Sequence, residues 1–187
     1  MLLTPTIFSD LRGAFCELWR DDRFNELLGP NIRFVQDNIS WSRKGTLRGL
    51  HFQKPPFEQG KLVFVPSGSV FDVAVDVRRG SPTFGQHFHV ELSGDNKRML
   101  WVPPGFAHGF LVLSDNATVL YKTTCHYAPG HECAIHWKDA DLEIPWPLRE
   151  DLKPLVSPKD ESAPPFMDIA DCSESRERIL SPKAARG

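Results

Sequence analysis

Polar and apolar residues alternate along the stretch Phe34–Gln53, which reads FVQDNISWSRKGTLRGLHFQ. A strand with one face in water usually carries charged side chains such as Lys and Glu on that face. The polar positions here carry amides, a hydroxyl, an arginine and a histidine, namely Gln36, Asn38, Ser40, Arg48, His51 and Gln53. Side chains of these kinds line polar pockets. The stretch therefore predicts strands that form part of a binding site.

A second stretch, Trp101–Phe110, has the same character and reads WVPPGFAHGF. It places His108 among apolar residues and behind the turn signal Pro103-Pro104-Gly105. We expect the two stretches to form opposite walls of one site.

Short β-type runs recur along the rest of the chain at about the 8–12 residue spacing of a sandwich or barrel. The clearest runs are Leu62–Val65, Val70–Val77, His87–Leu92, Met99–Val102, Phe110–Leu113 and Thr118–Thr124. Turn signals rich in Gly, Pro, Asn and Asp separate them. Helices are predicted only over Arg20–Leu28 and Ser173–Leu180. The pattern predicts an all-β fold of antiparallel sheets with a few short helices.

The chain length allows one well-filled core. With 187 residues it is too short for two domains of ordinary size. A content of 41% hydrophobic and 25% charged residues is typical of a globular protein. We therefore expect a single domain over residues 1–187. The segment 166–187 reads as a loosely attached tail.

Charge and cysteine usage limit the possible partners. The net charge is −2 and Lys and Arg form no basic run, which argues against a nucleic-acid partner. The sequence has no apolar stretch long enough for a membrane span, and its first residues do not resemble a signal peptide. The four scattered cysteines show no CxxC spacing. They predict reduced thiols and a cytoplasmic protein, with zinc and disulfides disfavoured.

The segments Gly45–Gln53 and Pro103–His108 have the spacing of the two motifs of the cupin superfamily, which they resemble. Metal-binding cupins carry a second histidine where this chain has Gln53. An amide oxygen is a poor ligand for iron or zinc beside imidazole, so a metal is disfavoured, although Glu58 could in principle serve as the acidic ligand. We expect no metal site.

Without a metal, His51 and His108 are free to transfer protons, because the ordinary pKa of histidine lies near neutrality. The alternative is that each is a core histidine bonded to backbone carbonyls. The pair His87 and His89 also alternates like metal ligands, but we expect it to form the exposed face of a strand.

Over roughly residues 8–160 the chain closely resembles the dTDP-4-dehydrorhamnose 3,5-epimerase family. The segments that carry the resemblance are FVQDNISWS, GTLRGLHFQ, QGKLVFV, VFDVAVDVRRGSPTFG, WVPPGFAHGF, LYKTT, IHWKDADLEIPWP and SPKD. The resemblance implies a cupin-type jelly roll, two packed antiparallel sheets, and a homodimer without metal or organic cofactor. It also implies an isomerase that inverts C3 and C5 of a dTDP-4-keto-6-deoxyhexose. An epimerase acting only at C3 or only at C5 of a related sugar is the alternative.

The resemblance implies five catalytic residues. His51 is the base, Asp160 orients it, and Tyr121 returns a proton from the opposite face of the sugar. Lys61 and His108 stabilise the oxyanion that forms on O4.

Further residues are expected from the resemblance to bind substrate. Those that match binding positions of the family are Arg12, Glu17, Gln36, Asp37, Asn38, Arg48, Glu132 and Lys159. Gln53, Asp72 and Tyr127 are expected to line the same pocket. For Arg12, Glu17, Glu132 and Lys159 an ordinary solvated surface position is the alternative.

Overall fold

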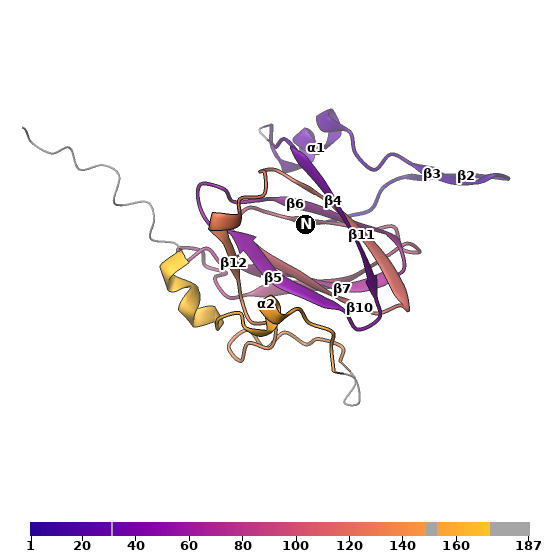
Figure 1. The fold of residues 1–187 in the computed structure, drawn as a ribbon. Coiled ribbons are helices and arrows are strands. Elements are labelled where there is room, and N and C mark those ends of the chain that lie inside the picture. The colour runs from indigo at the N-terminus through magenta and orange to yellow at the C-terminus, as the bar shows by residue number, and fades with distance from the viewer. Residues whose placement is uncertain (31, 149–152, 173–187) are drawn as a thin grey trace, which may run out of the picture.

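Two five-stranded antiparallel sheets, stacked face to face, form the body of the computed structural model, which describes residues 1–30, 32–148 and 153–172 (Figure 1). The strand order of the first sheet is β1 (Leu2–Leu3), β9 (Met99–Val102), β6 (Lys61–Ser67), β11 (Asn116–Thr123) and β4 (Gln36–Arg43). The order of the second is β12 (Glu132–Ala134), β5 (Leu47–Gln53), β10 (Phe106–Val112), β7 (Ser69–Asp76) and β8 (His87–Ser93). The predicted all-β fold of two packed sheets is confirmed.

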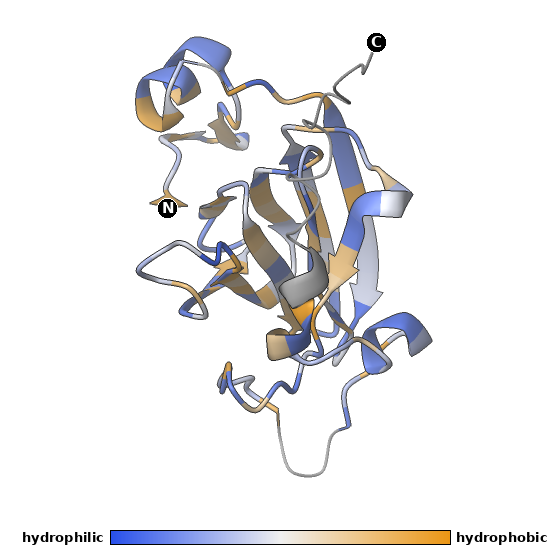
Figure 2. Ribbon diagram, turned by 90° about the vertical axis from the view of Figure 1, so that its left-hand side faces the viewer, coloured by the Kyte–Doolittle hydropathy of each residue, from blue (hydrophilic) through white to orange (hydrophobic). Residues whose placement is uncertain are grey.

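The main hydrophobic core lies between the two sheets. Its buried members come from β6, β9 and β11 on one side and from β7, β8 and β10 on the other. Val63, Val102 and Val119 of the first sheet and Val70 of the second are completely buried. Hydrophobic and hydrophilic residues alternate along many of the strands (Figure 2). The core thus fixes the spacing of the sheets beside the cavity described below.

The outer face of each sheet is covered as well. Helix α1 (Asp21–Leu28) buries Phe24 against Trp101 and Leu62 of the first sheet. On the second sheet, η2 (Phe166–Cys172) inserts Phe166 and Ile169 into an apolar cluster with β5 and β7. The prediction of a loose tail is therefore wrong for Phe166 and Ile169, because both side chains are buried.

The strand predictions from the sequence hold, with boundaries shifted by a few residues. The six runs correspond to β6, β7, β8, β9, β10 and β11, and the helix predicted over Arg20–Leu28 is α1. The helix predicted over Ser173–Leu180 lies outside the described residues. His89 is exposed as expected, whereas His87 is half-buried.

A hairpin of β2 (Ile7–Asp10) and β3 (Gly13–Cys16) extends away from the body as a separate two-stranded sheet (Figure 1). It carries Phe8, Leu11 and Phe15 exposed, with Phe15 at 69%. Within the described part of the chain, no helix is long and apolar enough to cross a membrane. The remaining elements are η1 (Pro129–His131) and α2 (Pro158–Glu161).

Candidate active site

A cavity with two compartments lies along the side of the sandwich where β4 faces β5. The smaller compartment has a volume of about 260 Å³ and the larger about 460 Å³. His51, Lys61 and Tyr121 line both compartments. Volumes of this size suit a small-molecule ligand.

The expected arrangement of the walls is wrong. His108 and His51 are paired residues on adjacent strands of one sheet, so the two stretches that carry them are neighbours and not opposite walls. The opposite wall is formed by β4, β6 and β11, which supply Asn38, Lys61 and Tyr121. The stretch Phe34–Gln53 contributes to both walls, because its first half is β4 and its second half is β5.

A β-bulge in β5 lets Arg48 and His51, which are three positions apart, both point into the cavity. His51 pairs with His108 and Arg48 pairs with Phe110, so β5 has one residue more than β10 over this interval. In a regular strand, residues three apart lie on opposite faces, and an extra residue changes that alternation. Arg48 and His51 consequently line the same compartment.

His51 is held by a buried carboxylate. Its Nε2 lies 2.5 Å from Oδ1 of Asp160, and the backbone N–H of Gly49 donates to Oδ2 of Asp160 at 3.4 Å. Burial is the largest single influence and would raise the pKa of Asp160, but the hydrogen bond and charge of His51, together with hydrogen bonds from Gly49 and Ser157, outweigh it, so the pKa lies below its ordinary value. As a carboxylate, Asp160 accepts the Nε2 hydrogen of His51, so in the neutral imidazole Nδ1 is the nitrogen without a hydrogen.

The short helix α2 presents Asp160 to His51. Ser157 caps this helix, because its hydroxyl accepts a hydrogen bond from the backbone N–H of Asp160, and Pro158 occupies the first helical position. Ser157 was not predicted to be a site residue. The signal was present, since Ser-Pro is a typical helix start.

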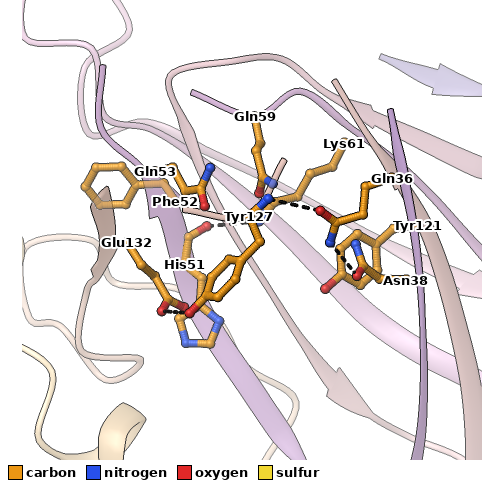
Figure 3. A pocket seen from close by; sticks show the side chains of 10 residues that line it. All are labelled: Gln36, Asn38, His51, Phe52, Gln53, Gln59, Lys61, Tyr121, Tyr127 and Glu132. Atoms are coloured by element: carbon orange, nitrogen blue, oxygen red, sulfur yellow. Dashed lines mark hydrogen bonds between the residues drawn. The ribbon is translucent and has the colours of Figure 1, made fainter. Parts of the chain in front are cut away.

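Tyr121 stands on the wall opposite His51. It belongs to β11, and Figure 3 shows the two side chains on opposite sides of the smaller compartment. Burial raises the pKa of Tyr121 above its usual value near 10, although the positive charge of Arg48 opposes the shift. Tyr121 therefore keeps its phenolic hydrogen at neutral pH.

Lys61 belongs to the same wall as Tyr121 and is only 7% exposed. Its Nζ donates to the backbone carbonyl of His51 at 3.2 Å. Burial lowers the pKa of Lys61 to about 8, and the negative charges of Asp72 and Glu132 keep it from falling further. The ammonium form is therefore the main form at neutral pH.

His108 forms a second histidine–aspartate pair with Asp72, whose side chain is fully buried. Its Nε2 lies 2.9 and 3.0 Å from the two carboxylate oxygens of Asp72, whose exposed fraction is 0%. His108 lines the larger compartment, whereas Asp72 lines neither. The expected place of Asp72 in the pocket lining is therefore wrong. A side chain at an even position of β7 points between the sheets, and His108 covers it there.

The mouth of the smaller compartment is lined by a chain of polar contacts. Tyr127 donates its hydroxyl hydrogen to Glu132 at 2.7 Å (Figure 3). Glu132 also forms an ion pair with Lys159. Burial would raise the pKa of Glu132, but its hydrogen bonds with Lys159 and Tyr127 lower it overall. The ring of Tyr127 remains half-exposed at this mouth.

Gln36, Asn38 and Arg48 also reach the cavity. The amide of Gln36 donates to Asn38 at 2.9 Å, and Nε of Arg48 donates to the hydroxyl of Ser42 at 3.2 Å. Gln53 lines the smaller compartment, but its amide is bonded to the backbone of Phe57, His126 and Ala128. Gln53 thus fixes the loops around the mouth.

Three predicted binding residues lie away from this cavity. Asp37 points outward and pairs with Lys122, as alternation along β4 requires. Arg12 is exposed in the β2–β3 turn, where it pairs with Asp10. Glu17 follows β3 and lies 3.8 Å from Arg20.

A family model and the curated relatives that match this chain carry the same family description. The family model described as dTDP-4-dehydrorhamnose 3,5-epimerase matches residues 1–168. A curated dTDP-4-dehydrorhamnose 3,5-epimerase of Pseudomonas aeruginosa is 53% identical over 172 residues, which cover 92% of this chain and 93% of that protein.

Solved structures agree with this match. A Legionella pneumophila dTDP-6-deoxy-D-glucose-3,5-epimerase in complex with dTDP-4-keto-L-rhamnose superposes with a TM-score of 0.88 at 53% identity, covering 92% of this chain and 90% of that chain. A 3′-monoepimerase of Streptomyces bikiniensis in complex with dTDP-quinovose is more distant in sequence, at 36% identity and a TM-score of 0.84, with 90% and 84% covered. The cupin-type jelly roll expected from the sequence is thereby confirmed.

Proposed function

This chain belongs to the dTDP-4-dehydrorhamnose 3,5-epimerase family, and we infer that it is an isomerase that inverts C3 and C5 of dTDP-4-dehydro-6-deoxy-D-glucose. The product is dTDP-4-dehydro-L-rhamnose. One observation carries this conclusion: His51, Lys61 and Tyr121 line both compartments of a single cavity. An imidazole, an ammonium and a phenol around one cavity can move protons beside a ketone.

The reaction requires three functions from the site. The C4 carbonyl acidifies the C–H bonds at C3 and C5, because the charge left after proton removal spreads onto O4. Inversion then needs a base on one face of the sugar and an acid on the other. A positive charge or hydrogen-bond donor must meet O4 while it is negative.

We propose that His51 is the base. Asp160 occupies Nε2 at 2.5 Å, so Nδ1 is the nitrogen that accepts the proton from carbon. The Asp160 carboxylate then stabilises the imidazolium that forms. The pair therefore combines a fixed tautomer with a nearby counter-charge.

We propose that Tyr121 is the acid. It faces His51 from the opposite sheet, and burial keeps its hydroxyl protonated. It can therefore give its hydrogen to the face of the carbanion that His51 does not reach. A proton delivered from that face completes the inversion.

Lys61 and His108 are proposed to meet the charge on O4. Lys61 brings an ammonium into a site that excludes most water, where its attraction for an oxyanion is strong. His108 lies on the neighbouring strand with Nε2 held by Asp72. Base, acid and oxyanion partners are all side chains, so we propose that no metal or organic cofactor takes part.

The diphosphate and nucleoside are proposed to bind next to the sugar. Arg48 offers a planar fork suited to oxygen pairs, and Ser42 holds it in place. Lys159 adds positive charge to the larger compartment, while Gln36 and Asn38 offer amides in the smaller one.

We propose that the working unit is a homodimer. Arg12 and Glu17 stand on or beside an arm that exposes Phe8, Leu11 and Phe15 and whose strands pair with no other strand of the described residues (Figure 1). Contact with a second copy would cover these apolar side chains and would bring Arg12 and Glu17 to its cavity. A cytoplasmic location is also proposed, since Cys16 and Cys125 form no disulfide within the described part of the chain; cell fractionation tests it.

An epimerase that inverts one centre only is the alternative. It is not favoured, because curated relatives at about half identity are 3,5-epimerases, whereas the monoepimerase of Streptomyces bikiniensis is 36% identical.

The distinguishing experiment is NMR of dTDP-4-keto-6-deoxyglucose incubated with the protein in heavy water. We expect deuterium at both C3 and C5, and none with His51→Ala. Label at one carbon alone would show a monoepimerase, and unchanged labelling with His51→Ala would remove His51 as the base.

A further inference from the structure

We propose that Ser40 is an additional substrate-binding residue, whose hydroxyl forms a hydrogen bond with a ring hydroxyl of the hexose. The inference rests on the proposed function of the cavity. It begins with the inward face of β4, where the polar side chains are Gln36, Asn38, Ser40 and Ser42.

Ser40 is the one side chain in this row whose hydrogen-bonding group has no partner among the described residues. Gln36 and Asn38 bond to each other, and Ser42 accepts a hydrogen bond from Arg48. Oγ of Ser40 is buried and makes no hydrogen bond. A buried hydroxyl without a partner destabilises a fold, so such a group calls for an explanation.

The position of Ser40 points to the substrate as the partner. Ser40 lines the larger compartment together with His51, Lys61, His108 and Tyr121. In the β4–β11 ladder Ser40 pairs with Val119, while Tyr121 pairs with Asn38. Ser40 and Tyr121 are therefore diagonal neighbours on one face of the sheet. A molecule that contacts Tyr121 can also contact Ser40.

The chemistry of the site favours a sugar hydroxyl over the other oxygens of the substrate. Lys61 and His108 are assigned to O4, and Arg48 and Lys159 supply the positive charge that phosphate oxygens require. A serine hydroxyl is neutral, and it both donates and accepts, as a sugar hydroxyl does. The hydroxyl that matches is the one on C3, a reacting carbon, or the one on the adjacent C2.

Ser40→Ala removes this hydroxyl and little else. We expect kcat/KM for dTDP-4-keto-6-deoxyglucose to fall by about five- to tenfold, the effect of one hydrogen bond between neutral groups. The affinity for dTDP alone should stay within about twofold of the parent, because dTDP lacks the hexose. The midpoint of thermal unfolding should not fall, since the lost hydroxyl has no protein partner in the free enzyme.

Two further variants make the test specific. Ser40→Thr retains a hydroxyl on a residue that suits a strand, and it should recover most of the lost kcat/KM. Ser93→Ala is the matched control: its hydroxyl is also buried, accepts a hydrogen bond from the backbone of Asn96, and belongs to β8 outside the cavity. It should lower the unfolding midpoint and leave kcat/KM unchanged.

Three results would overturn the inference. These are an unchanged kcat/KM in Ser40→Ala, a dTDP affinity that falls as much as kcat/KM, and a fall in the unfolding midpoint of Ser40→Ala like that of Ser93→Ala. The second would mark a diphosphate contact and the third a structural hydroxyl. Absence of deuterium exchange with the parent enzyme would instead contradict the proposed function itself, so the two failures are distinguishable.

Discussion

Lys61 is a cavity residue whose charge depends on its surroundings. Burial alone favours the neutral amine, and Asp72 and Glu132 restore part of the preference for the ammonium form. The resulting pKa of about 8 lies within reach of ordinary assay conditions. A neutral amine could still donate a hydrogen bond to O4, but it would no longer offer a charge.

The rate should therefore fall as the pH rises through 8. Above its pKa Lys61 loses its proton, and one pH unit higher roughly 90% of it is neutral. We expect an alkaline limb near pH 8 in the profile of kcat/KM. Lys61→Arg, which stays charged at every assay pH, should lack this limb whatever its rate. Tyr121 cannot be the source, because its pKa is raised above 10. A limb that persists in Lys61→Arg would contradict the assignment.

Among single residues, the family resemblance predicted the five that are proposed to be catalytic, and the structure brings all five to the cavity. The residue pattern predicted some of their neighbours. Alternation along β4 alone separates Gln36 and Asn38 from Asp37, which points outward. What alternation could not predict is the burial of Asp72 behind His108. That burial depends on how two strands distant in sequence are paired.

The bulge in β5 is the feature of a single strand that shapes the site most directly. It places Arg48 and His51 on one face and brings β5 close to β10. Gly49 makes this approach possible, because its φ is +113° and a Cβ there would lie 2.6 Å from Cα of Gly109. The same backbone segment donates from Gly49 to Asp160.

Gly49→Ala should lower both stability and activity. A non-glycine residue with this φ costs about 1–3 kcal/mol, and the clash with the backbone of β10 adds to it. We expect a lower midpoint of chemical unfolding and a loss of kcat, since Asp160 and His51 shift. Gly80→Ala is the control, because a Cβ at Gly80 meets nothing within 4 Å. Equal midpoints for the two variants would contradict this reading of the bulge.

The strands of the core were predicted from the sequence, whereas the β2–β3 hairpin and helix α2 were not. Hydrophobic runs predicted β6–β11, because each forms part of the core. The β2–β3 hairpin was missed, since its apolar side chains are exposed and alternate with few polar ones. Helix α2 was missed because it has only four residues, too few to show a helical hydrophobic pattern. The helix start Ser157–Pro158 was the remaining signal.

The molecule as a whole has an arm that its own body does not cover. Phe8 and Phe15 lie opposite each other on β2 and β3 with tilted rings whose centroids are 6.4 Å apart, and Leu11 at the tip is fully exposed. The sequence predicted a dimer only through family resemblance. Neither composition nor periodicity shows which surface is left without a partner.

Phe15→Asp should disrupt the dimer. A charge within the apolar arm would oppose burial against a second copy, so light scattering should give a monomer mass and dTDP should bind more weakly. Arg12→Ala should keep the dimer and weaken dTDP binding. Met167→Asp, which changes an exposed apolar residue of η2, is the control and should change neither. A monomeric parent protein, or a dimeric Phe15→Asp, would contradict the role of the arm.

The central claim is that base and acid stand on opposite walls of one cavity, and Tyr121→Phe tests it most directly. Without its hydroxyl the variant should bind dTDP normally. His51 should still remove a proton and return deuterium to the same face of the sugar in heavy water. We predict deuterium incorporation with the configuration at C3 and C5 retained, measured by NMR. Inversion at the parent rate in Tyr121→Phe would contradict the account.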